Sequence, residues 1–258
     1  MMEVSVNILD FDQVYQMQTY FKEAHYEWIK LSDIRNTNRY CESKALASIA
    51  KRLKKRKYRG ITFIGSGNYH YVTYLLMKDV KAPFTLILFD HHTDMKDAPC
   101  ESLVTCGSWV SKSLERLPML KKVIIIGTRE DLLESIPSYL NEKVLILSKE
   151  QMGQASIKEY IKSSISTYNV YISIDKDVLG KSEAVTNWDQ GNMKLMQLLN
   201  LIKYIAKNKR ICGIDVCGEY PYSPVLNCYP ESLEAVRKNN RANLTILNTI
   251  NKLEKKIS

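Results

Sequence analysis

The sequence predicts an α/β protein with a mostly parallel sheet that is covered by helices on both faces. Short, almost continuously apolar runs recur along the chain, as expected for strands that are buried on both sides. Helix-like segments alternate with these runs, and strand–helix alternation is typical of a parallel sheet. The chain has 258 residues, of which 45% are hydrophobic, so it can bury a sizeable core.

The expected elements follow one another without an interruption that would mark a domain boundary. No linker rich in Pro, Gly or Ser, no repeat and no low-complexity tract divides the chain, so we expect one domain over residues 1–258. The predicted strands are 4–9, 61–65, 84–89, 122–127, 143–148, 170–175 and 211–217. The predicted helices are 12–31, 42–56, 108–117, 156–166, 192–207 and 231–256.

The net charge is +9, and much of the excess lies in KRLKKRKYRG at 51–60, at the end of a predicted helix. Such a run could contact nucleic acid or an anionic surface. No nucleic-acid motif accompanies it, and basic side chains at a helix C-terminus interact favourably with the helix dipole. We therefore expect a solvated helix end and no nucleic-acid partner.

The six cysteines are spread along the chain without a C-x-x-C pair. The opening residues MMEVSVNILD lack the basic start and the long apolar stretch of a secretory signal. No apolar run approaches the roughly 20 residues that a membrane helix needs. These features predict a cytoplasmic protein with reduced thiols and no membrane association.

Reactive residues gather where four of the predicted strands end. SGNYH follows 61–65, DHHTD follows 84–89, DKDVLG begins at the last residue of 170–175, and GEYP follows 211–217. Three of the four histidines of the chain lie in these segments. In open α/β sheets, ligands bind outside the carboxyl ends of the strands, so we expect the functional site there.

The segment DHHTD has two adjacent histidines, which cannot face the same way on an extended chain. Side chains alternate on extended backbone, so Asp90, His92 and Asp94 point together, whereas His91 points to the other side. We therefore predict that His91 is packed against its neighbours. The same rule groups Asp175 with Asp177 in SIDKD.

With His70, these segments supply four carboxylates and two imidazoles. A single D-x-D at a strand end is commonly a turn or helix cap. Here DHHTD, SIDKD and the segment of His70 all lie at the ends of predicted strands, and this coincidence favours a metal site. The carboxylates would repel one another without cations among them, and the set is too large for one tetrahedral zinc. It suits two divalent ions, and two imidazoles among hard oxygen ligands favour Mn²⁺ over Mg²⁺.

These motifs resemble those of the arginase/agmatinase (ureohydrolase) family, which carries a G-G-x-H-like element, then D-A-H-x-D, then S-x-D-x-D. Here they read GSGNYH, DHHTD and SIDKD, and the resemblance covers roughly residues 61–221. It implies a three-layer α/β/α sandwich. It also implies a small-molecule substrate, a homo-oligomer, and hydrolysis of a linear non-peptide C–N bond in a guanidino, amidine or amide compound by a metal-bridging hydroxide.

The resemblance also assigns roles to individual side chains. It implies that one ion is completed by His70 and the other by His92, and that Asp94 also holds the hydroxide and acts as a catalytic residue. The implied metal ligands are His70, Asp90, His92, Asp94, Asp175 and Asp177, with Asp90 and Asp175 bridging the two ions.

The sequence departs from the family pattern around the metal motifs. Gly180 and Lys181 stand where the third motif usually continues as D-x-x-D-P. The arginine- and agmatine-cleaving members carry a proton-shuttling histidine about a dozen residues after D-A-H-x-D. Here TCGSW places Cys106 or Ser108 near that position.

Substrate contacts are expected from two further segments. GEYP stands where the family has an E-V-N-P-like element, and we take Glu219 as a pocket residue although Gly218 aligns with the family's glutamate. TNWDQG follows the D-x-D strand, so Trp188 and Asp189 are candidates for substrate contact, as is Cys106. Trp188 and Asp189 could equally form a loop turn with a packed indole.

Two other classes of function stay open. The string LFDHH also resembles the DHH phosphoesterases, which place a D-x-D in an early strand before D-H-H. The early D-x-D here is Asp10 and Asp12, and no glycine- and serine-rich turn follows it, so motif order favours the ureohydrolase hypothesis. Because the shuttle histidine is missing, the chain could also be a non-catalytic descendant that binds metal and ligand without turnover.

Overall fold

The computed structural model describes residues 5–57, 60–135, 140, 142–153, 156–221, 223, 225 and 229–257. Its centre is an eight-stranded sheet in the order β2-β1-β4-β10-β9-β5-β7-β8, in which all neighbouring strands are parallel. The strands are β1 (Val6–Asp10), β2 (Tyr26–Lys30), β4 (Ile61–Gly65), β5 (Phe84–Phe89), β7 (Leu120–Thr128), β8 (Val144–Ser148), β9 (Asn169–Asp175) and β10 (Arg210–Cys217). Two short strands, β3 (Tyr40–Glu42) and β6 (Leu103–Thr105), pair antiparallel beside this sheet.

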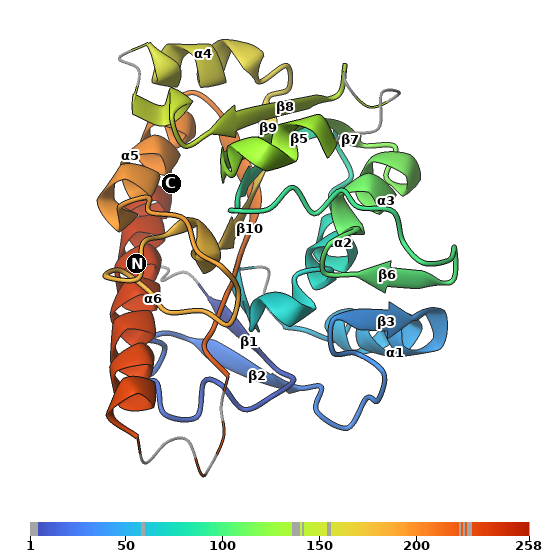
Figure 1. The fold of residues 1–258 in the computed structure, drawn as a ribbon, viewed down its shortest axis with the longest axis vertical. Coiled ribbons are helices and arrows are strands. Elements are labelled where there is room, and N and C mark those ends of the chain that lie inside the picture. Colours follow the sequence, from blue (N-terminus) through green and yellow to red (C-terminus); the bar gives the residue numbers. More distant parts are fainter. Residues whose placement is uncertain are drawn as a thin grey trace.

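Helices cover both faces of the sheet, so the expected three-layer α/β/α architecture is present (Figure 1). On one face lie α1 (Ser43–Leu53), α2 (Val72–Met77) and α3 (Trp109–Arg116). On the other lie α4 (Ile157–Ser164), α5 (Leu195–Ala206) and the long α6 (Pro230–Ile257). Five of these six helices fall in segments that the sequence predicts as helical, whereas the short α2 was not predicted.

Continuous apolar runs form the central strands because both faces of each strand are buried. In β5, Leu86 and Leu88 pack under α1–α3, whereas Ile87 and Phe89 pack under α5 and α6. Each such side chain contributes about 1.5–3 kcal/mol when it leaves water. The two cores therefore hold the strand ends in a fixed arrangement, on which a site can be built.

The prediction of a helix over 12–31 is wrong. Residues 14–17 and 20–23 form turns, and β2 then runs parallel to β1 at the edge of the sheet. The apolar spacing that suggested a helix comes from turn residues whose rings pack inward: Phe21 lies 4.9 Å from the ring of Tyr26 and 5.8 Å from that of Trp28, measured between centroids. Tertiary packing of aromatic rings thus overrides the local helical pattern.

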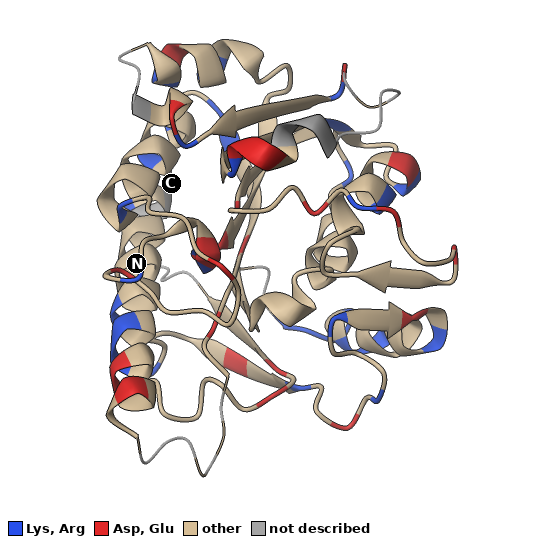
Figure 2. Cartoon of the chain, in the orientation of Figure 1, with Lys and Arg blue, Asp and Glu red and all other residues tan. Residues whose placement is uncertain are grey.

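The described part of the basic run, residues 51–57 and 60, lies at and after the C-terminal end of α1, as expected. Arg52 pairs with Asp33 at 2.6 Å, and Arg56 pairs with Asp79 at 2.6 Å. Along α6, acidic side chains lie in the first turns and basic side chains follow them (Figure 2), and Glu234 pairs with Arg237 one turn later. Within the described residues, no helix combines the length and apolarity needed to cross a membrane.

Candidate metal centre

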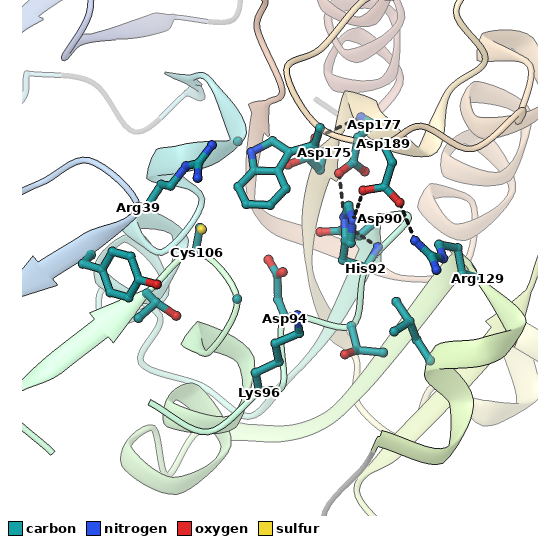
Figure 3. A pocket seen from close by; sticks show the side chains of 17 residues that line it. Arg39, Asp90, His92, Asp94, Lys96, Cys106, Arg129, Asp175, Asp177 and Asp189 are labelled. Atoms are coloured by element: carbon teal, nitrogen blue, oxygen red, sulfur yellow. Dashed lines mark hydrogen bonds and ion pairs between the residues drawn. The ribbon is translucent and has the colours of Figure 1, made fainter. Parts of the chain in front are cut away.

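The candidate site lies at the carboxyl ends of β4, β10, β9 and β5, which are adjacent in the middle of the sheet. A cavity of about 430 Å³ opens there (Figure 3). Its lining residues are Arg39, Tyr40, Gly67, Asp90, His92, Thr93, Asp94, Lys96, Thr105, Cys106, Gly107, Arg129, Leu132, Asp175, Asp177, Trp188 and Asp189.

His70 enters the site after a single 3₁₀ turn, Gly67–Tyr69, that follows β4. Its ring is 1% exposed, and its Nδ1 faces three carboxylates: 3.1 Å from Asp94 Oδ2, 3.3 Å from Asp90 Oδ2 and 3.5 Å from Asp175 Oδ2. Glycine favours the close approach of this turn, because a Cβ on Gly67 would lie 3.0 Å from Asp175 Oδ2, tighter than an ordinary contact. The backbone thus approaches the carboxylates closely enough to deliver His70 among them.

The opposite nitrogen of His70 is fixed by a buried chain of hydrogen bonds. His70 Nε2 lies 2.9 Å from Ser173 Oγ, which donates to Asp215 Oδ1 at 2.7 Å. Since the Ser173 proton goes to Asp215, Ser173 accepts from Nε2–H of His70. Nδ1 then carries the lone pair, and it points at the carboxylates, as a metal-binding imidazole requires.

His92 is oriented in the same way on the other side of the site. Its Nδ1 lies 2.9 Å from Asp177 Oδ2 and 3.6 Å from Asp90 Oδ1. Its Nε2 lies 2.8 Å from Asp189 Oδ1 (Figure 3). A carboxylate on Nε2–H leaves the Nδ1 lone pair for an ion, so Asp189 is a positioning partner of His92. The imidazole of His91 belongs to none of the donor groups, and only its backbone N–H reaches the site, donating to Asp177 Oδ1.

The backbone is not extended throughout DHHTD or SIDKD, so side chains do not alternate there as they would in a strand. The alternation rule nevertheless predicted which side chains converge. Asp94 has a φ of +51°, so a left-handed residue, not the strand pleat, turns its side chain toward His70. Residues 176–178 form a 3₁₀ turn that Asp175 caps by accepting from the Asp177 N–H. This turn carries Asp177 back to the site and sends Lys176 the other way, into the core.

The residues present fit two divalent ions. Donor atoms of His70, Asp90 and Asp94 lie within 4.8 Å of one another, as do those of Asp90, His92 and Asp177, so the two groups share Asp90. His70 Nδ1 and Asp90 Oδ2 are buried and have no hydrogen-bond partner. Buried polar atoms without a partner are costly, and a cation between them would remove that cost.

Electrostatics support the same conclusion. Burial and the charge of Asp90 raise the pKa of Asp94 to about 6. Burial and neighbouring carboxylates also raise the pKa of Asp175 and of Asp177. The carboxylates therefore resist being ionised together without a cation, which is the behaviour expected of a ligand set that awaits positive charge.

A thiol that the sequence did not suggest also lies in the site. Cys217, the last residue of β10, places Sγ 3.0 Å from Asp175 Oδ2, and it forms a third donor group with His70 and Asp175. Burial and the charge of Asp175 hold the pKa of Cys217 well above its ordinary value. The neutral thiol thus donates to the carboxylate and fixes its orientation.

Glu219 does not line the cavity, contrary to expectation. Its side chain is 1% exposed and forms an ion pair with Lys176, which is 0% exposed. Glu219 also accepts from Gln18 at 2.8 Å and from Asn243 of α6 at 2.7 Å. Gly218 cannot take the place of the family's glutamate, because its φ is +88° and a Cβ there would lie 2.5 Å from Asp175 Oδ1.

Trp188 lines the cavity. Its indole N–H donates to Asn68 Oδ1 at 3.0 Å, and its ring lies edge-on to His92 with centroids 5.8 Å apart. Arg39 places its guanidinium carbon 5.0 Å from the ring centroid of Trp188. No pattern in the sequence indicated Arg39, which comes from a distant loop and itself has a left-handed backbone with a φ of +64°.

Neither residue at the position of the missing histidine is a ready base. Cys106 lines the cavity, but burial and the charge of Asp94 raise the pKa of its thiol to about 12, so the thiol is neutral near pH 7. Ser108 is buried, and its Oγ accepts from the backbone N–H and the hydroxyl of Thr105. Cys106 and Ser108 therefore contribute shape and local order to the cavity wall.

The early D-x-D lies away from the cavity. Asp10 accepts from the indole of Trp28 and from the backbone of Gln13, both at 3.0 Å. Asp12 does not line the cavity, and burial raises the pKa of its carboxyl to about 7. The two carboxylates that the phosphoesterase hypothesis needs beside DHHTD thus lie outside the cavity.

A model of the Arginase family matches residues 1–224 of the chain. An uncharacterized protein of Thermotoga maritima is 32% identical over 248 residues, which cover 95% of this chain and 89% of the relative. Among solved structures, proclavaminate amidino hydrolase from Streptomyces clavuligerus has a TM-score of 0.67 at 15% identity, over 98% of this chain and 93% of that one. Arginase from Bacillus caldovelox has a TM-score of 0.63 at 16% identity, over 95% and 98%. At these identities, the structural likeness shows the fold alone.

Proposed function

Because this chain belongs to the arginase family, we propose that it is a hydrolase that uses two divalent metal ions to cleave a linear non-peptide C–N bond. The bond would belong to a small guanidino, amidine or amide compound. The observation that carries this proposal is the pair of donor groups that share Asp90, each with an imidazole Nδ1 turned inward.

His70 and Asp94 would hold one ion, and His92 and Asp177 the other. Asp90 would contribute to both shells, and Asp175 would join from the end of β9. The oxygen-rich set with two imidazoles favours Mn²⁺. When bound, such ions polarise the substrate and lower the pKa of coordinated water from 15.7 to as little as about 7.

Asp94 would be the residue that moves the proton. Its carboxyl lines the cavity, and the indole N–H of Trp109 donates to its Oδ2, which holds the group in position. A carboxylate positioned beside the reacting groups can act as a general base and then as a general acid. It would take a proton from the attacking water and deliver it to the departing amine, since neither His25 nor His91 lines the cavity.

Trp188 would form the wall against which the substrate packs, and Asp189 would orient His92 at the cavity mouth. Cys106 would contact the substrate as a neutral, compact side chain. We also propose that the chain works as one domain over 1–258, and that a cytoplasmic setting keeps its thiols reduced. Assembly into a homo-oligomer is part of the same proposal.

Metal analysis of protein purified without chelator tests the centre. We expect about two Mn²⁺ per chain, lost in Asp90→Ala, whose carboxylate both donor groups use. Asp10→Asn is the matched control, because Asp10 ends β1 in a buried position yet does not line the cavity, and it should keep both ions. The opposite pattern would favour the phosphoesterase hypothesis.

Turnover is tested separately, by the release of ammonia or urea from a panel of guanidino, amidine and amide compounds with the manganese-loaded protein. Release that disappears in Asp94→Asn, while the metal content is kept, supports the proposed proton transfer. Tight ligand binding without release from any compound would instead identify a non-catalytic descendant.

A further inference from the structure

The wall of the metal cavity carries three basic side chains from three separate segments. Arg39 comes from the loop before β3, Lys96 from the loop after β5, and Arg129 from the end of β7. They surround the carboxylates from different sides (Figure 3). A cavity that binds a substrate with a positively charged tail would be expected to have acidic residues at these positions. The basic side chains therefore indicate which charge the tail of the substrate carries.

Arg129 is already neutralised. Its guanidinium binds both carboxylate oxygens of Asp131, at 2.6 Å and 2.9 Å, and it reaches Asp189 Oδ2 at 2.6 Å. By contrast, no ion pair in the described part of the chain involves Arg39 or Lys96. These two cations line the cavity without a carboxylate partner of their own.

Arg39 is held in position by its backbone and by an aromatic ring. Its N–H donates to the Asn68 carbonyl at 3.2 Å, and its own carbonyl accepts from Cys106 N–H at 2.9 Å. The same Asn68 accepts from Trp188, the ring next to the guanidinium. A contact with the ring face leaves the N–H groups at the guanidinium edge free to bind a ligand.

The charge balance of the cavity follows from these pairs. Two divalent ions would neutralise the four carboxylates of Asp90, Asp94, Asp175 and Asp177. Arg129 carries one positive charge against the two carboxylates of Asp131 and Asp189, so that cluster keeps one negative charge. Arg39 and Lys96 add two positive charges at the exposed rim of a cavity of about 430 Å³, which leaves the wall with one net positive charge and favours an anion over a cationic tail.

We propose that the substrate carries a carboxylate remote from its scissile C–N bond, and that Arg39 and Lys96 bind this carboxylate. The inference rests on the proposed function, since it places the scissile group at the two ions. Arg39 would supply a paired N–H contact, which suits a planar carboxylate, and Lys96 would add a charge from the facing wall. The substrate class is thus an anionic guanidino, amidine or amide compound.

The test compares three guanidines with the same chain length and different tails: guanidinobutyrate, butylguanidine and agmatine, which end in a carboxylate, a methyl group and an ammonium. Primary amides with the same three tails form a second series. Calorimetric titration of manganese-loaded protein at one ionic strength gives each affinity. We expect the carboxylate tail to bind about tenfold more tightly than the methyl tail, which corresponds to about 1.4 kcal/mol, and the ammonium tail to bind most weakly.

Arg39→Gln and Lys96→Gln should each reduce this preference, and Arg39→Lys should keep part of it. Arg35→Gln is the matched control, because Arg35 lies in the same loop, is exposed and does not line the cavity. Equal affinity for all tails, a preference for ammonium, or no measurable binding in either series would overturn the inference. So would a carboxylate preference that survives in Arg39→Gln.

Amine release measured on the same samples keeps the two proposals apart. Hydrolysis without a preference among tails would refute the anionic substrate and leave the hydrolase intact. A carboxylate preference lost in Arg39→Gln, without hydrolysis of any compound, would refute the hydrolase and leave the anion-binding wall.

Discussion

Substitution of Glu219 by Gln removes the charge that balances Lys176 in the core. Both side chains are almost completely buried, and the remaining contact of Lys176 Nζ is with Asn243 Oδ1 at 3.1 Å. Removing one member of a buried ion pair costs about 3–5 kcal/mol, because the other charge stays desolvated. For a chain of this length, the midpoint of thermal unfolding should fall by about 10 °C.

The assay is thermal and denaturant unfolding of chelator-treated protein, so that metal binding does not contribute. Glu234→Gln is the control, since this partly exposed residue of α6 forms a surface pair with Arg237, and it should change the free energy of unfolding by no more than about 0.5 kcal/mol. Lys176→Met combined with Glu219→Gln should recover more than half of the loss, because no charge is then buried alone.

A loss below about 1 kcal/mol in Glu219→Gln, or a double variant as unstable as the sum of the single ones, would refute this reasoning. A third outcome is equally informative. If Glu219→Gln keeps its stability and raises KM for a substrate, Glu219 acts in the pocket, as the sequence first suggested.

Three further predictions concern single side chains. His92→Ala should lose an ion that His91→Ala keeps, measured as bound manganese per chain; equal loss in both would contradict the orientation of the doublet. Asp189→Asn should weaken metal binding about 10- to 100-fold, because Asp189 orients His92 through Nε2–H, and unchanged affinity in a calorimetric titration would argue against that role. Since burial raises the pKa of Asp12 to about 7, folding favours its protonated form; this stabilisation is present in full below about pH 4 and is lost as pH rises through 7. Unfolding of chelator-treated protein from pH 4 to 8 should therefore show a falling free energy, and Asp12→Asn should flatten the fall; an unchanged slope would contradict it.

The fold could be predicted wherever burial on both faces leaves an unambiguous pattern. β4, β5, β7 and β9 read as continuous apolar runs because helices cover each side, and they appear within one or two residues of the expected bounds. β2 gave no such signal: it is an edge strand, largely exposed or half-buried, and its rings Tyr26 and Trp28 pack with Phe21 from the preceding turn. The pairing of β2 with β1 depends on contacts with other segments, and the sequence of the strand alone does not show them.

At the site, the motif residues could be predicted because metal ligands must be His and Asp at the ends of adjacent strands. Residues that support the ligands carry no comparable signature. Ser173, which positions His70, looks like any strand serine, and Arg39 reaches the cavity from a loop in which its own backbone is left-handed. Lys176 sits between two ligands, yet its burial became apparent only once α6 and its partner Glu219 were in place.

The contacts of Lys176 also link the metal site to the packing of α6. Its turn presents Asp175 and Asp177 to the site, but its partners Glu219 and Asn243 come later in the chain, and Asn243 lies far along α6. Glu219 is held in turn by Gln18 from the N-terminal region. A folding chain can therefore form the sheet and bring its metal ligands together while the interior lysine still lacks its full set of partners. Stable capture of metal should follow the packing of α6 on the sheet.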